Sequence, residues 1–444
     1  MKEIIDRTMP ALIEDLKAII RIPSVSRGEP EDGMPLGRHV HDALHCALDT
    51  AKRLGFTEAR SLDGYCGVVD YGEGDEMLMI MAHLDVVPAG TGWTSDPFEP
   101  VIRDGRLYGR GVEDDKGAAI AALYALSAVR EKGIPLRRRV RILFGCDEER
   151  GWKCIHRYKE TEELPTLAFT PDAGYPVVHS EMGICHATYE KKLAGSGVAI
   201  RCGTASNVVP GEARATLPFA PVPCPVPDGF TADYDGNTVT VHGFGGHAAH
   251  PETAKNALLV LFDLLSQQPL SPDDAVTAAS LHALFAMDEH GEGFSLDIQD
   301  ASGRLTLVPT MLDWNENGVC LTLDSRYPFT CEYERLQRTL EETFGALGFA
   351  EKEISHTPGH FIDPNSELVA TLMDIYETHI GHKSAPMSIG GGTYARAFPN
   401  AVAFGLIPED EPSLCHMPDE SLSLDALRFT TVVIADAIAR LAGK

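Results

Sequence analysis

The chain has 444 residues, and because a single compact core stops growing near about 250–300 residues, we expect two domains. The formal charge of -27 at pH 7 argues against a nucleic-acid partner and against an anionic membrane surface, since both need clustered Lys and Arg. No apolar run approaches the ~18–20 residues of a membrane span, and residues 1–7 lack the apolar core of a signal peptide. The ten scattered Cys include no C-x-x-C pair, which favours reduced thiols and a cytoplasmic protein.

The first 180 residues alternate between helical and strand patterns. Apolar residues recur at helical spacing in the first segment, a second helical segment ends at Gly55, and a third, rich in Ala and Leu, ends at Gly133, while continuous apolar runs indicate buried strands in three others. The predicted helices cover 4–20, 39–54 and 117–131, and the predicted strands cover 77–81, 140–144 and 167–169. This alternation is typical of an α/β fold with a mostly parallel central sheet.

The pattern changes after about residue 180. Strand-like pieces rich in Pro and Gly follow, with helices predicted at 252–267 and 332–347 and a strand at 319–323. Strands with two helices fit a smaller α+β domain, in which the Pro-rich segment 218–227 is expected to be a loop between strands rather than a recognition segment. The α/β pattern returns with helices at 366–380 and 424–441. The expected first domain therefore covers 1–182 and 358–444, and 183–357 is inserted into it.

Polar side chains follow the predicted strands at the point where each strand ends. His83 and Asp85 follow the first strand, Glu148 and Glu149 the second, and Asp172 the third. Ligands collect at the carboxyl ends of parallel strands, where a His can bind a metal while an acid two residues on orients its ring. Each segment taken singly can also be a turn or a solvated loop. The prediction of a metal site depends on their coincidence at one edge of the sheet.

Three adjacent acids, Glu113, Asp114 and Asp115, stand at the predicted start of the helix over 117–131. A helix cap needs only one acid, and three neighbouring carboxylates repel each other unless cations lie among them. Imidazole and carboxylate ligands without thiolates suit zinc, manganese or cobalt. Since one carboxylate commonly bridges the two cations of a two-metal hydrolase, the residues predict a hydrolase that binds two divalent metal ions.

Six motifs in this order resemble the co-catalytic zinc metallopeptidase family, which includes aminoacylases, desuccinylases, glutamate carboxypeptidase and carnosinase. The motifs are HLDVVP, GRGVEDDKG, DEE, TPDA, GGHAAHP and LCHMPDE. The segments DEERGW, TPDAGYP and SIGGGTYARAFPNAVAFG are most similar to the branch of the bacterial dipeptidase PepV. The resemblance implies a zinc-peptidase-like catalytic domain with an inserted α+β lid domain.

The resemblance also assigns the metal ligands. They are His83, Asp114, Glu149, Asp172 and His416. His83 and Asp172 would hold one cation, Glu149 and His416 the other, and Asp114 would bridge the two. A cis peptide between Asp114 and Asp115 is implied as well. Only the resemblance makes His416 a ligand, because its sequence neighbours give no indication of metal binding.

The same family pattern implies catalytic roles for three further residues. Glu148 is the expected general base, Asp85 supports the His83 ring, and His247 is expected to stabilise the oxyanion. His250 competes with His247 for this role, although a position beside a helix start is the simpler interpretation of His250. His41 and His45 lie four residues apart on a predicted helix without an acidic partner, so we expect them to form a solvated helix face.

Recognition of a dipeptide requires a cation for the substrate carboxylate. Arg326 and Asn207 match the family's substrate-binding positions, and Gly391 and Gly392 in the run 390–393 are expected to let backbone amides approach that carboxylate. The alternative interpretation of the glycine run, phosphate binding, is disfavoured because no P-loop Lys-Ser/Thr pair follows.

The expected activity is therefore that of a dipeptidase that removes one amino acid from dipeptides with a free N-terminus. The alternative is an N-acyl amino acid amidohydrolase of the same fold, since both reactions cleave an amide next to a carboxylate. A small peptide is the expected substrate, and zinc or manganese, with cobalt as a further choice, the expected cofactor. The insertion resembles the enlarged domain of the PepV branch, and we therefore expect a monomer in which His247 acts within its own chain.

Overall fold

The computed structural model describes residues 1–26, 30–193, 195–286 and 288–444. The chain divides into two compact units. The first unit contains Met1–His179, Ile362–Met387 and Gly392–Lys444, and the second contains Ser180–Phe361 and Ser388–Gly391. Among the described residues, no helix is both long enough and apolar enough to cross a membrane.

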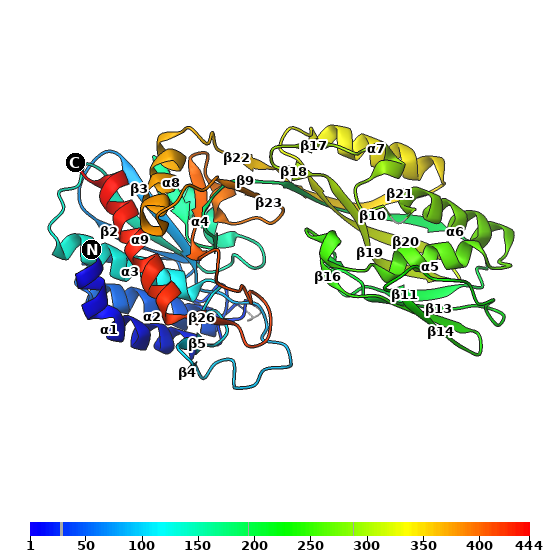
Figure 1. Ribbon diagram of the computed structural model, residues 1–444, viewed down its shortest axis with the longest axis horizontal. Helices are drawn as coiled ribbons and strands as arrows, with labels where there is room; N and C mark the ends of the chain where they lie inside the picture. The colour runs from blue at the N-terminus through cyan, green and yellow to red at the C-terminus, as the bar shows by residue number, and fades with distance from the viewer. Residues whose placement is uncertain (27–29, 194, 287) are drawn as a thin grey trace. The chain divides into compact units, whose positions relative to one another are not determined.

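The first unit is an α/β structure around a mixed sheet (Figure 1). Its helices are α1 (Lys2–Ile20), α2 (Arg38–Arg53), α3 (Lys116–Glu131), α4 (Lys153–Thr161), α8 (Glu367–Ile380) and α9 (Leu424–Ala442), with the 3-10 turn η3 (Tyr394–Ala397). Its main sheet contains β1 (Glu58–Leu62), β2 (Cys66–Tyr71), β3 (Met77–His83), β6 (Arg139–Gly145), β7 (Leu167–Thr170), β24 (Ala401–Phe404) and the first part of β9 (Val177–Glu181). Short strands β4 (Val101–Arg103), β5 (Arg106–Tyr108) and β26 (Ser421–Ser423) form a separate sheet, and β8 (Ala173–Gly174) pairs with β25 (Leu406–Ile407).

The strand order β1-β2-β6-β3-β7-β24-β9 confirms the predicted α/β class. The parallel part of the sheet is its middle, because β3 pairs parallel with β6 and β7, and β24 pairs parallel with β7. The strands on either side, β1, β2 and β9, pair antiparallel. The carboxyl ends of β3, β6 and β7 therefore reach the same edge of the sheet.

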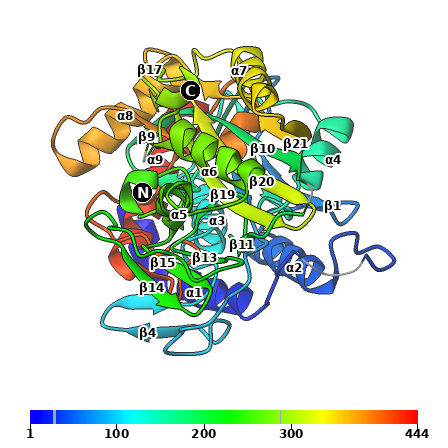
Figure 2. The ribbon, with the colours of Figure 1, turned by 90° about the vertical axis from the view of Figure 1, so that its right-hand side faces the viewer.

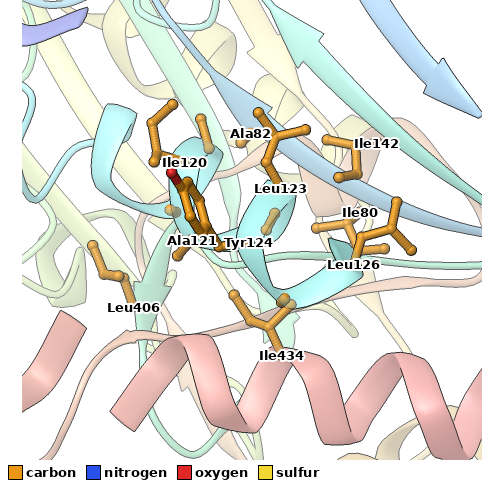
Figure 3. Packing of buried hydrophobic residues seen from close by; sticks show 14 of the residues in the cluster. Ile80, Ala82, Ile120, Ala121, Leu123, Tyr124, Leu126, Ile142, Leu406 and Ile434 are labelled. Atoms are coloured by element: carbon orange, nitrogen blue, oxygen red, sulfur yellow. The ribbon is translucent and has the colours of Figure 1, made fainter. Parts of the chain in front are cut away.

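Buried side chains cover both faces of this sheet. On β3, Leu78, Ile80 and Ala82 belong to the large core that includes α1, α2, α3, α8 and α9, while Met79 and Met81 belong to the core beneath α4 and η3. Figure 3 shows α3 between the strands and α9, with Ile434 of α9 on the side of α3 away from Ile80. Because successive side chains on a strand alternate in direction, His83 shares the face of Met79 and Met81.

The second unit contains an antiparallel sheet in the order β14-β15-β13-β11-β19-β20-β10-β21. These strands are β10 (Gly183–Lys192), β11 (Ala199–Cys202), β13 (Glu212–Thr216), β14 (Thr231–Asp235), β15 (Thr238–His242), β19 (Thr306–Asn315), β20 (Gly318–Tyr327) and β21 (Ala350–Thr357). The helices α5 (Ala257–Ser266), α6 (Pro272–Phe285) and α7 (Tyr333–Ala346) pack against one face of this sheet (Figures 1 and 2). The remaining short elements are β12 (Val208–Val209), β16 (Gly246–His247), β17 (Gln299–Asp300), β18 (Gly303–Arg304), η1 (Pro251–Thr253) and η2 (Glu292–Phe294). At the boundary of the units, β22 (His360–Phe361) and β23 (Met387–Ile389) pair with β9.

The prediction of two helices for this region was wrong, because α6 was missed. Ser271 caps α6 by accepting a hydrogen bond from the backbone N–H of Asp274, and Pro272 occupies the first turn. Ser followed by Pro and two acids is an ordinary helix start, so the signal was present in the sequence. The helix predicted at 252–267 begins later than expected, with Asn256 capping α5. The Pro-rich segment 218–227 connects β13 to β14, as expected.

Candidate metal centre

His83 is the last residue of β3 and is almost fully buried. Its Nδ1 donates a hydrogen bond to the carbonyl oxygen of Asp85 at 2.9 Å, which directs Nε2 toward the carboxylate of Asp114. The ring lies edge-on to Tyr394, with the centroids 6.3 Å apart. Burial opposes a charged ring, but the hydrogen bond that the ring donates to Asp114 and the charge of Asp172 raise the pKa of His83 well above its ordinary value. Nε2 of His83 therefore faces the carboxylates of Asp114 and Asp172.

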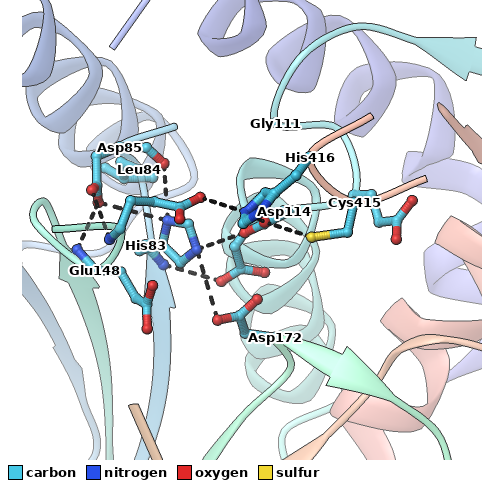
Figure 4. A network of polar contacts seen from close by, with 12 residues as sticks. His83, Leu84, Asp85, Gly111, Asp114, Glu148, Asp172, Cys415 and His416 are labelled. Carbon is cyan, nitrogen blue, oxygen red and sulfur yellow. Dashed lines mark hydrogen bonds and ion pairs between the residues drawn. The ribbon is translucent and has the colours of Figure 1, made fainter. Parts of the chain in front are cut away.

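Asp114 joins two groups of potential ligands (Figure 4). One of its oxygens, Oδ1, lies 2.8 Å from Nε2 of His83, and the other, Oδ2, lies 2.9 Å from Nε2 of His416. Asp172 lies 3.7 Å from the same nitrogen of His83, and Glu149 lies 3.2 Å from the same nitrogen of His416. Four of the predicted ligands, His83, Asp114, Asp172 and His416, thus lie in two groups that share one carboxylate, and Glu149 joins the cluster through its contact with His416.

The electrostatics of this cluster fit two divalent cations. Burial and the charges of neighbouring acids raise the pKa values of Glu148, Asp172 and Asp115 well above the ordinary range. The five grouped ligands consist of imidazole nitrogens and carboxylate oxygens, a donor set that suits zinc, manganese and cobalt. His83 with Asp172 could hold one cation and His416 with Glu149 the other, with Asp114 between them.

Asp115 shows that the acid cluster is not a helix cap. Asp115 occupies the N-cap position of α3, yet its side chain makes no cap hydrogen bond. Instead its Oδ2 accepts a hydrogen bond from the backbone N–H of His83 at 3.0 Å. The peptide between Asp114 and Asp115 is cis, as the family resemblance implied.

Asp85 is fully buried and supports the loop that follows β6. Its carboxylate accepts hydrogen bonds from the backbone N–H groups of Glu148 at 3.1 Å and of Glu149 at 3.2 Å. Burial raises the pKa of Asp85 to about 6. The carboxylate lies 3.6 Å from Nδ1 of His83, so the backbone carbonyl of Asp85 makes the closer contact with that ring. Asp85 therefore connects the ends of β3 and β6.

Glu420 was missed as a site residue, although it ends the LCHMPDE motif. Its buried carboxylate accepts hydrogen bonds from the backbone N–H groups of Gly111, Glu113 and Asp114, and it pairs with Arg110 at 2.6 Å. This single side chain fixes the backbone that carries Asp114. An acid four residues after a predicted ligand was the available signal.

Asn207 and His247, two predicted site residues of the second unit, lie next to each other. Asn207 accepts a hydrogen bond from the N–H of Ala248 through its backbone carbonyl, and Val208 pairs with His247 in the β12–β16 ladder. Nδ1 of His247 accepts a hydrogen bond from the N–H of Ala249 at 3.0 Å. Because this contact needs a lone pair on Nδ1, a neutral His247 ring carries its proton on Nε2, as an oxyanion donor requires.

Arg326 is buried and its planar fork faces Asp324. Nε and Nη2 each donate to Asp324 at 2.8 Å, and Nη1 donates to the carbonyl of Gly390 at 2.9 Å. These bonds use three of the five N–H groups of the guanidinium. A side chain at Gly391 would meet no atom closer than 4.0 Å, whereas one at Gly392 would lie 2.7 Å from Arg396. A side chain at Gly392 would therefore displace the guanidinium of Arg396, whereas one at Gly391 would not.

The histidines that the sequence did not favour as site residues, His41, His45 and His250, lie outside the ligand groups around Asp114. His41 and His45 contact each other on α2, with ring centroids 4.2 Å apart, and neither belongs to a group of metal-binding side chains among the described residues. His250 is the N-cap residue of η1 and lies 3.4 Å from Glu252. His41 also lies 3.5 Å from Asp42, contrary to the expectation of no acidic partner, but in the described part of the chain neither arrangement belongs to a group of three or more ligands such as those around Asp114.

The sequence and fold of this chain were compared with those of known proteins. The family model described as Peptidase family M20/M25/M40 matches residues 79–440. A Bacillus subtilis protein named "Putative dipeptidase YtjP" is 35% identical over 97% of both chains. The solved structure of the di-peptidase Dug1p from Saccharomyces cerevisiae has a TM-score of 0.62 at 14% identity and covers 98% of this chain and 97% of its own. The Bacillus subtilis protein YXEP, described as a dinuclear metal binding peptidase, has a TM-score of 0.55 at 11% identity and covers 98% of this chain and 99% of its own.

The match of the family model extends over most of the chain, and the identity to the Bacillus subtilis relative extends over nearly all of it. The low identities of the solved structures show a shared fold. This chain therefore belongs to Peptidase family M20/M25/M40.

Proposed function

We propose that this protein is a dipeptidase that hydrolyses dipeptides with a free N-terminus at a centre for two divalent metal ions. The observation that carries the proposal is the position of Asp114, whose two oxygens face His83 and His416 in separate ligand groups. The name of the Bacillus subtilis relative supports a dipeptidase, and the description of YXEP supports a dinuclear centre.

The metal ligands in this proposal are His83, Asp114, Glu149, Asp172 and His416. Zinc or manganese, with cobalt as a further choice, suits their nitrogen and oxygen donors. Two such cations, when bound, lower the pKa of a water and polarise a carbonyl group.

Glu148 is the proposed general base. It takes the proton of the attacking water and passes it to the nitrogen of the leaving amino acid. Burial among acids raises its pKa well above the ordinary range, which favours a group able to hold and release a proton. Asp85 positions this base, because it binds the backbone N–H groups of Glu148 and of the neighbouring Glu149.

We assign substrate recognition to four residues of the second unit and to Gly392. The Nε2–H of His247 would donate to the oxyanion, while Asn207 and Arg326 would bind the substrate together with the backbone at Gly391 and Gly392. Support comes from the hydrogen bond on Nδ1 of His247 and from the guanidinium N–H groups of Arg326 that remain beyond its three bonds. In this assignment 1–182 and 358–444 form the catalytic domain, and 183–357 forms the lid.

We further propose a cytoplasmic monomer in which His247 acts within its own chain. The ten cysteines are all free, which agrees with a reducing compartment. Light scattering should give a single-chain mass. Mixing a Glu148→Gln variant with a His247→Ala variant should restore no activity, whereas recovery would show that His247 acts across subunits.

The decisive assay compares dipeptides with their N-acetylated forms. We expect turnover of the free dipeptides and none of the acetylated forms. Turnover of the acetylated forms alone would identify an N-acyl amino acid amidohydrolase instead. Metal analysis of protein purified without added metal would identify the native cations.

A further inference from the structure

Cys415 lies at the metal centre and was not among the predicted ligands. Its Sγ donates a hydrogen bond to Oδ2 of Asp114 at 2.9 Å, and Nε2 of His416 lies 2.9 Å from the same oxygen. The ligand atoms of Asp114, Cys415 and His416 all lie within 4.8 Å of one another (Figure 4). We propose that Cys415 is a thiolate ligand of the cation held by Asp114 and His416, and that it biases this position toward zinc over manganese.

The backbone brings two successive side chains to one oxygen. Neighbouring side chains on extended chain point in opposite directions, but His416 has a φ of 64°, in the left-handed region that side-chain-bearing residues rarely adopt. With this turn, Cys415 and His416 both reach Oδ2 of Asp114. The backbone N–H of Cys415 also contacts Oγ of Ser413 at 3.5 Å, and Ser413 in turn donates to the buried Glu113.

The spacing of these atoms suits one shared cation. Zinc bonds are about 2.0–2.3 Å long, so two ligand atoms on one zinc ion lie about 3–4 Å apart. The separations of 2.9 Å from Oδ2 to Sγ and to Nε2 require only a small outward movement of both groups. On coordination the thiol loses the proton that it now donates to Asp114, since the thiolate is the ligand form.

Cys415 is an exposed residue, although its thiol is partly buried against Asp114. Of the ten cysteines, all of which lie in the described part of the chain, Cys415 alone is exposed. It lines a cavity of about 290 Å³ together with Asp114, Asp172 and Ser413. A cation that enters this cavity meets a sulfur donor beside the bridging carboxylate. Because thiolates favour zinc over manganese, the residue determines metal preference.

Cobalt is the direct probe, because a cobalt–thiolate bond produces a charge-transfer absorption in the near ultraviolet that oxygen and nitrogen ligands do not. We expect the band in the wild type with two bound Co²⁺ ions, and in the control variant Cys224→Ser, whose cysteine lies in the second unit. Cys415→Ser should lose the band while still binding two Co²⁺ ions. In competition between Zn²⁺ and Mn²⁺, the preference for zinc should fall about tenfold or more in Cys415→Ser and stay unchanged in Cys224→Ser.

The outcomes separate this inference from the proposed function on which it rests. Two bound Co²⁺ ions without the band in the wild type would mean that Cys415 only donates a hydrogen bond to Asp114, and would overturn the inference while the two-metal centre stands. A band that persists in Cys415→Ser would overturn it as well. Fewer than two bound Co²⁺ ions in the wild type would overturn the two-metal proposal itself.

Discussion

Asp114 and Asp115 are adjacent in sequence but have opposite electrostatic surroundings. Burial favours protonation of both, yet hydrogen bonds with His416 and His83 hold the pKa of Asp114 well below its usual range. Asp115 has no hydrogen bond from either imidazole ring, and although the charge of His83 acts in the opposite direction, burial and the charge of Asp114 place its pKa well above the usual range. The ionised acid is the one that both ligand groups share. At this scale, the role of a carboxylate depends on its neighbours rather than on its residue type.

Replacing the proposed base should separate catalysis from metal binding. Glu148→Gln keeps the size of the side chain but cannot accept the proton of water, so we expect kcat to fall by about 10²–10⁴-fold with metal content unchanged. Glu73→Gln, at an exposed position, is the control and should behave as the wild type. Steady-state kinetics with elemental analysis measures both quantities. Retained turnover in Glu148→Gln would rule out this residue as the base.

The two histidines of the 245–251 loop should differ in their effect on catalysis. His247→Ala removes the proposed oxyanion donor, so kcat should fall by about 10²–10³-fold, while KM changes little. His250→Ala provides the matched control, because His250 is exposed and its ring lies 3.4 Å from the carboxylate of the neighbouring Glu252. Equal losses in the two variants would contradict the assignment of His247.

At the scale of elements, the loop before α3 depends on a residue from the distant C-terminal segment. Glu420 binds three backbone N–H groups of residues 111–114 and also pairs with the buried Arg110. Glu420→Gln should weaken metal affinity about 10–100-fold, because the backbone that carries Asp114 loses acceptors. Glu420→Ala should additionally cost about 3–5 kcal/mol of unfolding free energy, since it leaves the charge of Arg110 buried without its partner. A chromophoric chelator measures the affinity, and unchanged affinity in both variants would show that the loop holds its shape without Glu420.

Gly145, the last residue of β6, leaves the space that the side chain of Tyr394 occupies. A Cβ at Gly145 would lie 2.0 Å from the hydroxyl oxygen of Tyr394, which is fully buried and whose ring lies edge-on to His83. Gly145→Ala should therefore destabilise the protein by about 1–3 kcal/mol and also weaken metal binding. Gly345→Ala is the control, because no atom lies within 4 Å of its Cβ on helix α7, and it should raise stability by about 0.5–1 kcal/mol. Thermal unfolding compares them, and an unchanged midpoint in Gly145→Ala would contradict this packing.

The sequence predicted elements and ligands where the signal was local. Apolar runs located β3, β6 and β7, and the polar residues at their ends, such as His83 and Asp172, follow from the parallel arrangement of those strands. The contacts of Glu420 with the loop before α3 join residues about 300 positions apart, so no local pattern reports them. The same holds for Arg326, whose neighbour Gly390 comes from a distant part of the chain. Helix α6 was missed although its start signal is local, because Ser271, Pro272 and the two acids that follow form an ordinary helix N-terminus.

At the scale of the whole molecule, burial of acids links folding to cation binding. The buried carboxylates gather at one edge of the sheet of the first unit, where β3, β6 and β7 end. Without cations, folding has to bring these acids together out of water, which costs free energy unless they bind protons. Bound cations would replace those protons, and stability should therefore depend on metal and on pH together.

Removing the metals should make this linkage measurable. Burial raises the pKa of Asp85 to about 6 and that of Glu420 to about 7, so the folded metal-free chain keeps protons that the unfolded chain releases near its ordinary pKa of about 4. Between about pH 4.5 and 7 the unfolded state therefore binds fewer protons, and the unfolding free energy of metal-free protein should fall as pH rises. Burial also lowers the pKa of Lys116 to about 7, but this acts in the opposite direction and only above about pH 7, because below it both states hold that proton.

Metal-loaded protein should respond differently over the same range. Cations bind the deprotonated ligands, so their affinity rises with pH, and a ligand at about 1,000 times its Kd adds about 4 kcal/mol to stability. We therefore expect the difference in Tm between metal-loaded and chelator-treated protein to widen from about pH 5 to about pH 7. Calorimetric scans at fixed ionic strength, with Glu420→Gln as a variant that removes one of the titrating groups, would measure the difference. If the difference in Tm stays constant or narrows with rising pH, the cations do not neutralise the buried acids.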